Sequence, residues 1–151
     1  MKKILFIAEI GNNHNGDLDR AKRLILASKA SGANVAKFQL RNFDTLYRGG
    51  IDSVEDLGVE YTKELISKYE LSRDTHIELA LYCFKNKIEY MCTPWDLESV
   101  EFLETLNVRR YKVASADFDN IPLISKIIET GKHLILSTGM ASSQDRCLRT
   151  V

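Results

Sequence analysis

Lys37 is the residue whose setting points most directly to chemistry. It lies in the apolar run Val35-Ala36-Lys37-Phe38-Gln39, and a lysine within a strand is destabilising unless it is paired or faces an anion. Gln39 shares its face, because alternate residues of a strand point to the same side of a sheet. An anionic ligand is the economical explanation for this pair.

A second cation, Lys112, lies in the run Tyr111-Lys112-Val113-Ala114-Ser115-Ala116-Asp117. Ser115 and Asp117 share a face, whereas Lys112 and Ser115 would point to opposite faces of an ideal strand. Lys112 and Ser115 can face one ligand only if the chain bends between them. Hydroxyl groups also end other apolar runs, and Gly139 would let backbone N–H groups approach an anion. These hydroxyls belong to Thr93, Ser115, Ser137 and Thr138.

The densest polar cluster is Ile7-Ala8-Glu9-Ile10-Gly11-Asn12-Asn13-His14-Asn15-Gly16. The carboxylate of Glu9 could accept hydrogen bonds from sugar hydroxyls or exchange a proton; alternatively, a neighbouring lysine satisfies it. His14 could hydrogen-bond a ligand or stabilise its turn. A single histidine is weak support for a metal.

Five predicted strands alternate with helices and end in these polar residues. This order predicts an α/β fold with a parallel sheet or barrel. In a (β/α) barrel the carboxyl ends of the strands build the active site. The predicted strands are Ile4–Glu9, Asn34–Gln39, Glu89–Thr93, Arg110–Ser115 and Leu134–Ser137.

Four helices are expected between the strands, and each begins with a residue that caps helices well. The expected caps are Asp17, Ser72, Asp96 and Asn120. In the helix after Ser72, the pattern predicts that Ile77, Ala80, Leu81 and Phe84 face inward. Residues 41–71 form a longer excursion, which is either an active-site loop or a solvated insertion.

The overall composition excludes several classes of function. The 151 residues contain 21 basic and 21 acidic side chains, so neither nucleic acid nor an anionic membrane surface is an expected partner. No apolar run approaches the roughly 20 residues of a membrane span. Three cysteines without metal-like spacing indicate free thiols and a cytoplasmic location. Nucleotide-binding loops and a serine-nucleophile motif are also missing from the sequence.

The motifs resemble those of the sialic acid synthase family, the phosphoenolpyruvate-dependent nonulosonate synthases. Five segments match in family order and at about family spacing. They are residues 7–16, Ala36-Lys37-Phe38-Gln39, Cys92-Thr93-Pro94-Trp95-Asp96, residues 111–117 and Ile135-Leu136-Ser137-Thr138-Gly139-Met140.

The resemblance implies a TIM (β/α)8 barrel that condenses phosphoenolpyruvate with an N-acetylated sugar such as N-acetylmannosamine. A complete barrel needs roughly 250 residues, so residues 1–151 are expected to be its N-terminal part, with about five strands and four helices. The later strands and the family's C-terminal antifreeze-like domain would lie outside this chain. The family forms homodimers.

Site roles follow from the same resemblance. Lys37, Thr93, Lys112, Ser115 and Ser137 would hold phosphoenolpyruvate, with Gln39 and His14 as further substrate contacts. Glu9 would bind the sugar near its reacting end, and Asp117 would handle a proton or water. The family uses a divalent metal, Mn²⁺ or Mg²⁺, held by two histidines from later strands, which His76 and His133 do not match. The metal ligands are therefore not expected in this chain.

Two rival hypotheses remain. One is a barrel aldolase that forms a Schiff base through Lys37 or Lys112. The other is an inactive half-barrel that binds an anion or pairs with a second polypeptide, since its edge strands would be open to association.

Overall fold

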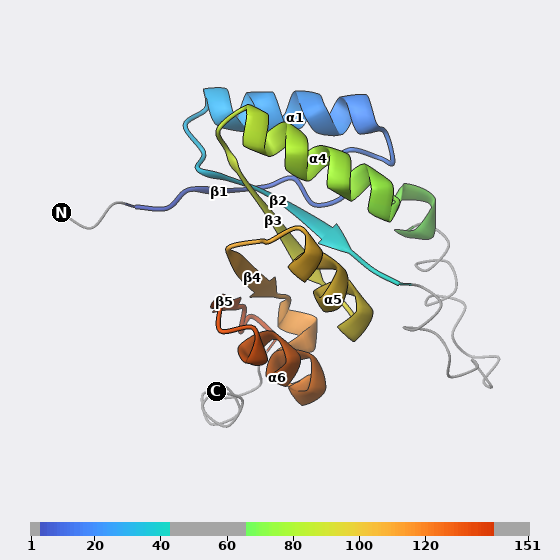
Figure 1. Ribbon diagram of the computed structural model, residues 1–151, viewed down its shortest axis with the longest axis vertical. Coiled ribbons are helices and arrows are strands. Elements are labelled where there is room, and N and C mark those ends of the chain that lie inside the picture. The colour runs from blue at the N-terminus through green and yellow to red at the C-terminus, as the bar shows by residue number, and fades with distance from the viewer. Residues whose placement is uncertain (1–3, 43–65, 141–151) are drawn as a thin grey trace.

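A computed structural model describes residues 4–42 and 66–140 of the chain (Figure 1). Strands and helices alternate through these residues, as the sequence predicts. The elements in order are β1 (Ile7–Glu9), α1 (Leu18–Ala30), β2 (Val35–Leu40), α4 (Arg73–Lys85), β3 (Glu89–Pro94), α5 (Leu97–Thr105), β4 (Arg110–Val113), the 3₁₀ turn η1 (Ser115–Asp117), α6 (Ile121–Glu129) and β5 (His133–Leu136).

All the strand pairs are parallel, which confirms the predicted α/β class. β1, β2 and β3 form one sheet, and β4 and β5 form a second. β3 and β4 contact each other without a shared ladder of backbone hydrogen bonds. Arg110 on β4 donates two hydrogen bonds, of 2.8 and 3.2 Å, to the carboxylate of Glu89 on β3. These bonds join the two sheets. Because every strand pair is parallel, the strands of each sheet end at the same edge.

The helices begin where their capping residues predict. Asp17, Ser72, Asp96 and Asn120 each accept a hydrogen bond from a backbone N–H in the first turn of the following helix. Such a bond satisfies one of the backbone donors that a helix start leaves unpaired. Gly32 ends α1 at φ +86°, a left-handed conformation that favours glycine.

The core lies between the sheets and their covering helices. α1 and α4 lie side by side over β1, β2 and β3, while α5 packs against β3 and α6 (Figure 1). Ala21 and Ile25 of α1, and Val100 and Leu103 of α5, are completely buried.

The predicted inward face of α4 is wrong for three of its four residues. Ile77, Leu81 and Phe84 are exposed, and Phe84 retains 81% of its accessible surface. The buried face consists of His76, Leu79 and Cys83 instead. The hydroxyl of Tyr90 lies 2.7 Å from Nδ1 of His76, so the histidine has a polar partner in the core. That partner allows a less apolar face to point inward.

Two predicted strands are shorter than expected. Residues 4–6 are exposed and precede β1, because Ile7 is the first residue that pairs with β2. β4 ends at Val113, where the chain turns into η1. The chain therefore bends between Lys112 and Ser115, and their contact with one ligand stays a prediction.

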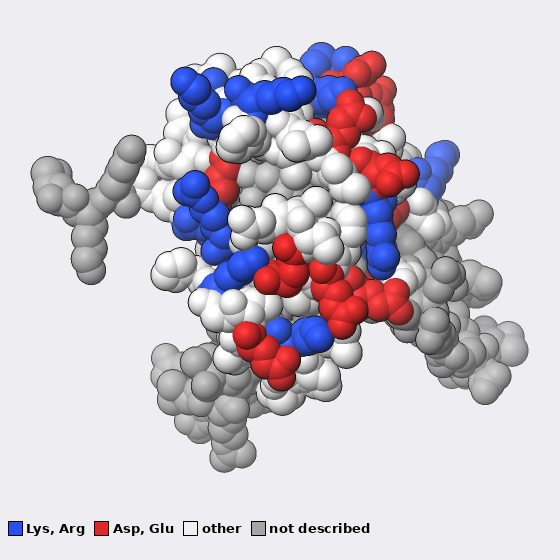
Figure 2. All heavy atoms as spheres, viewed as in Figure 1, with Lys and Arg blue, Asp and Glu red and all other residues white. Residues whose placement is uncertain are grey.

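The 41–71 excursion is described only at its ends. Residues 66–69 are helical, and residues 43–65 lie outside the described part of the chain. Within the described residues, no helix is both long and apolar enough to span a membrane. Acidic and basic side chains intermingle on the face shown in Figure 2.

Candidate functional site

The carboxyl edge of β1, β2 and β3 brings three predicted site residues into direct contact. Lys37 is 2% exposed, and its Nζ lies 2.6 Å from Oε2 of Glu9. The same Nζ donates a hydrogen bond of 3.1 Å to Oγ1 of Thr93. Glu9 and Lys37 are partners in the β1–β2 register, which places the two side chains next to each other. The buried lysine thus has both an anionic and a neutral partner.

Lys112 extends this cluster from the second sheet. Burial lowers its pKa, the charge of Lys37 lowers it further, and the charge of Glu9 acts in the opposite direction. Two lysines and one carboxylate therefore lie within electrostatic range of one another. An additional anion at this place would relieve the repulsion between the two cations.

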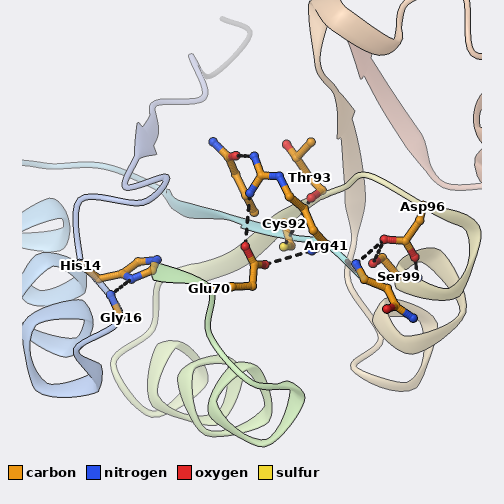
Figure 3. Close-up of polar contacts among 10 residues, drawn as sticks. His14, Gly16, Arg41, Glu70, Cys92, Thr93, Asp96 and Ser99 are labelled. Carbon is orange, nitrogen blue, oxygen red and sulfur yellow. Dashed lines mark hydrogen bonds and ion pairs between the residues drawn. The ribbon is translucent and has the colours of Figure 1, made fainter. Parts of the chain in front are cut away.

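Arg41 is a site residue that the sequence interpretation missed. Its guanidinium pairs with Oε2 of Glu70 at 3.3 Å, and its backbone N–H donates to Oε1 of the same carboxylate at 3.0 Å (Figure 3). The guanidinium also lies 4.4 Å from the ring centre of Trp95, a cation–π contact. Only 8% of the Arg41 side chain is exposed.

The signal for Arg41 was present in the sequence. Positions 37, 39 and 41 follow the alternation that places Lys37 and Gln39 on one face. The predicted strand ended at Gln39, whereas the side-chain pattern continues beyond it. Glu70 gave no comparable signal, because it comes from the far end of the 41–71 excursion.

Gln39 contacts both Arg41 and the neighbourhood of Glu9. Its Oε1 accepts a hydrogen bond from the Arg41 guanidinium. Gly11 lies next to the nitrogen of this amide. If Gly11 carried a Cβ atom, that atom would lie 3.3 Å from Oε1 of Glu9 and 3.4 Å from Nε2 of Gln39. A carboxylate acceptor and an amide donor therefore lie together beside Gly11.

Asp117 lies in η1, just beyond β4. Its Oδ1 accepts a 3.1 Å hydrogen bond from the Asn120 side chain. Its Oδ2 is buried without a hydrogen-bond partner among the described residues. Burial raises the pKa of this carboxyl group, and the charge of Arg41 partly opposes that shift. A carboxylate with one free, partly desolvated oxygen is suited to accept a proton from a ligand or from water.

Ser137 follows β5 directly, and Ser115 begins η1, separated from the end of β4 by one residue; both are half-buried. The backbone N–H of Ser137 donates to the carbonyl of Val113 at 3.2 Å, which holds the two strand ends together. Thr138 and Gly139 are exposed. These placements agree with the predicted hydroxyl-lined edge.

His14 lies apart from the lysines. Its ring packs 6.1 Å from Phe38, which alternates with Lys37 and Gln39 and so faces the opposite side of β2. Its Nδ1 accepts a 3.1 Å hydrogen bond from the backbone N–H of Gly16 (Figure 3). Burial lowers its pKa. The packing favours the turn-stabilising alternative, and a ligand contact at His14 stays a prediction.

The described residues do not fit a divalent metal. Within residues 4–42 and 66–140, no three histidine, cysteine or acidic side chains come together as a metal site. Cys83 and Cys92 are buried free thiols, and burial raises the pKa of each to about 12. Cys147 lies outside the described residues. No chemical step at this edge is therefore assigned to a metal.

Comparison with known proteins identifies the family. Residues 24–147 match the NeuB family. This chain belongs to the NeuB family. It is 40% identical over 147 residues to the N,N'-diacetyllegionaminic acid synthase of Campylobacter jejuni, an alignment that covers 94% of this chain and 44% of the relative. It is 38% identical over 141 residues to the human N-acetylneuraminate-9-phosphate synthase, covering 90% of this chain and 39% of the relative.

One solved structure has a similar arrangement of elements. The N-acetylneuraminic acid synthetase of Leptospira borgpetersenii, solved in complex with citrate, superposes with a TM-score of 0.86 at 29% identity. The match covers 99% of this NeuB-family chain and 49% of that protein. The chain thus spans less than half the length of these relatives.

Proposed function

We propose that this chain forms the phosphoenolpyruvate-binding part of a nonulosonate synthase, which condenses phosphoenolpyruvate with an N-acetylated hexose. The observation that carries the proposal is the buried Lys37, close to Lys112 at the carboxyl edge of the strands. Phosphoenolpyruvate carries a phosphate and a carboxylate, so two neighbouring cations suit it well. The NeuB relatives, which are named as legionaminic and sialic acid synthases, support the same reaction class.

The proposed fold of the whole protein is a TIM barrel, with β1 to β5 as its first five strands. The proposal also extends to the homodimer and to the Mn²⁺ or Mg²⁺ ion of the family. Two histidines from later strands, outside these 151 residues, would hold that ion.

The binding roles follow from charge and position. Lys37 and Lys112 bind the anionic groups of phosphoenolpyruvate, and Thr93, Ser115 and Ser137 donate hydrogen bonds from their hydroxyls. Because 52% of the Glu9 side chain is exposed, its carboxylate can also accept hydrogen bonds from a sugar. Gln39 supplies a donor beside it.

The chemistry forms one carbon–carbon bond and one carbon–oxygen bond to water, and it breaks the carbon–oxygen bond to phosphate as C2 becomes a carbonyl carbon. C3 of phosphoenolpyruvate attacks the sugar aldehyde, whose oxygen takes up a proton. Water adds at C2, and Asp117 accepts the proton that this water loses. Phosphate then leaves with its bridging oxygen. The lysines stabilise negative charge on the departing phosphate, and such preorganised electrostatic stabilisation is usually the largest catalytic contribution.

The test is phosphate release by the intact protein from phosphoenolpyruvate labelled with ¹⁸O at the bridging position. We expect release only when an N-acetylated hexose is present, with the label retained in phosphate. Release without sugar, or label retained in the organic product, would contradict the proposal. N-acetylmannosamine and its diacetylated analogues should be compared, since the named relatives differ in their sugars.

A Schiff-base aldolase is the second candidate, and one observation favours it. Burial and Lys37 lower the pKa of Lys112, as a nucleophilic amine requires. Borohydride reduction in the presence of a carbonyl substrate separates the candidates. The synthase gives no covalent adduct on Lys112, whereas the aldolase gives a reduced adduct that mass spectrometry detects.

A further inference from the structure

We propose that Arg41 is a positioning residue for the acceptor sugar: it orients the Gln39 amide so that the N–H groups of that amide face the substrate beside Glu9. The inference rests on the proposed function for its substrate. Its structural part, the orientation of Gln39, can be tested without any activity.

The chemistry of arginine determines which way the amide points. A guanidinium has donors and no acceptor, so it can hydrogen-bond only to the oxygen of the Gln39 amide. Oε1 of Gln39 is the atom that receives this bond. The Nε2 donors therefore point away from Arg41, and Nε2 lies on the side of Gly11 and Glu9.

Arg41 is itself held from two other directions. Glu70 binds both its guanidinium and its backbone N–H, and Trp95 lies beneath the guanidinium. Figure 3 shows Arg41 between the carboxylate of Glu70 and the carboxyl end of the strand that bears Thr93. A side chain restrained in this way loses little further entropy when it orients a neighbour.

The oriented amide produces a mixed recognition edge. Glu9 offers an acceptor and Gln39 offers donors, both next to Gly11. Gly11 has φ +53°, and any side chain at this position would crowd both groups. A polyhydroxylated sugar with an N-acetyl group can match such a pair, because its hydroxyls donate and its carbonyl accepts.

The first test uses the two glutamines of this chain, Gln39 and Gln144. With ¹⁵N-labelled glutamine, each gives its own pair of side-chain amide signals in an NMR spectrum. We expect Arg41→Met to move the Gln39 signals and to speed their hydrogen exchange about 10-fold, while Gln144 serves as an internal reference. Arg41→Lys, which keeps a donor, should give a smaller change.

Arg73→Met is the matched control. Arg73 also pairs with a carboxylate, Glu98 at 3.6 Å, and stacks on an aromatic ring, Phe102 at 5.5 Å, but half of its side chain is exposed. This variant should leave the Gln39 signals unchanged. Gln39 signals that stay unchanged in both Arg41 variants, measured in folded protein, would overturn the proposal.

The second test is kinetic and uses the intact enzyme. Arg41→Met should raise the KM for the sugar about 10-fold, the size expected when one charge-assisted hydrogen bond is lost, with the KM for phosphoenolpyruvate changed less than about twofold. Adding Arg41→Met to Gln39→Met should have no further effect, because Arg41 would act through Gln39. Equal increases in both KM values would contradict this role. If the wild type releases no phosphate, the proposed function fails, while the NMR result still decides the orientation of Gln39.

Discussion

Polar groups are buried in two different settings in this protein. One is the carboxyl edge of the strands, and the other is a set of polar pairs elsewhere in the fold. We use the name structural pairs for Arg110 with Glu89 and for His76 with Tyr90. Each structural pair joins groups that complement each other directly. At the carboxyl edge, by contrast, Lys112 lies near a second lysine, Lys37. A buried atom without a hydrogen-bond partner among the described residues occurs in both regions, as Oδ2 of Asp117 and as Nε2 of His76.

The difference indicates which polar groups serve stability and which serve a ligand. Groups that favour the folded state are paired with a complementary group, whereas functional sites tolerate neighbouring like charges that an anionic substrate later neutralises. Variants of Lys112 and Asp117 at the carboxyl edge should therefore lose activity with little loss of stability. Variants in the structural pairs should do the reverse.

The largest effect is expected for Lys112→Met. Losing one of two cations that face the phosphoenolpyruvate anion should lower kcat/KM for phosphoenolpyruvate by about 100- to 1,000-fold. The free energy of unfolding should change by less than about 1 kcal/mol, because the removed charge is partly desolvated and near another cation. Steady-state kinetics and urea unfolding measure the two quantities. Lys22→Met, on the surface of α1, is the matched control and should leave kcat/KM unchanged.

His76 tests the structural side through pH. Burial lowers its pKa from the usual 6.5 to about 4, with a smaller contribution from His14. Between these two values the unfolded chain binds the proton and the folded chain does not, so stability falls as pH decreases from 6.5 to 4. The loss amounts to about 3 kcal/mol over that interval.

The measurement is urea unfolding at several pH values for the wild type and His76→Gln. The variant should lose most of this pH dependence, whereas the matched change at the exposed His133 should retain it. Equal pH dependence in the wild type and His76→Gln would contradict the role of His76.

Arg110→Met tests the pair that joins the two sheets. It leaves Glu89 partly buried without its forked partner, so the free energy of unfolding should fall by about 2 kcal/mol. Activity per folded molecule should stay within about twofold of the wild type. Lys126→Met removes an exposed ion pair with Glu101 and should lower stability by less than about 0.5 kcal/mol. A large loss of activity in folded Arg110→Met would break the distinction between the two regions.

Asp117→Asn should have a smaller effect on activity than Lys112→Met. A raised carboxyl pKa means that the fold disfavours the charged form, so removing the charge should raise stability at neutral pH by less than about 1 kcal/mol. That gain should vanish as pH falls and the wild-type carboxyl group becomes protonated. Phosphate release should nevertheless decrease at least 10-fold, because the amide cannot accept the proton from water. A lower stability at neutral pH would show that the fold does not disfavour the Asp117 charge.

Much of the fold could be predicted because local patterns determine it. Helix starts depend on one capping side chain and its first turn, and all four expected caps agree with the structure. The orientation of α4 could not be predicted in the same way. It depends on Tyr90, a distant residue on β3 that makes the burial of His76 possible.

The candidate site could likewise be predicted where local pattern determines it, but not where tertiary contacts do. The sequence predicted that Lys37 requires partners, and Glu9 and Thr93 provide them. The alternation of Lys37 and Gln39 could have included Arg41, but its partners Glu70 and Trp95 are remote in the sequence and meet it only in the folded chain. Local pattern identifies side chains that need a partner, but only the tertiary structure identifies the partner.

The most direct test of the role of Lys37 is the binding of radiolabelled phosphoenolpyruvate, measured by equilibrium dialysis. Wild type, Lys37→Met and Arg110→Met are compared at equal folded concentration. Lys37→Met should weaken binding at least 100-fold, whereas Arg110→Met should bind like the wild type. Phosphoenolpyruvate binding of wild-type strength by folded Lys37→Met would contradict this role.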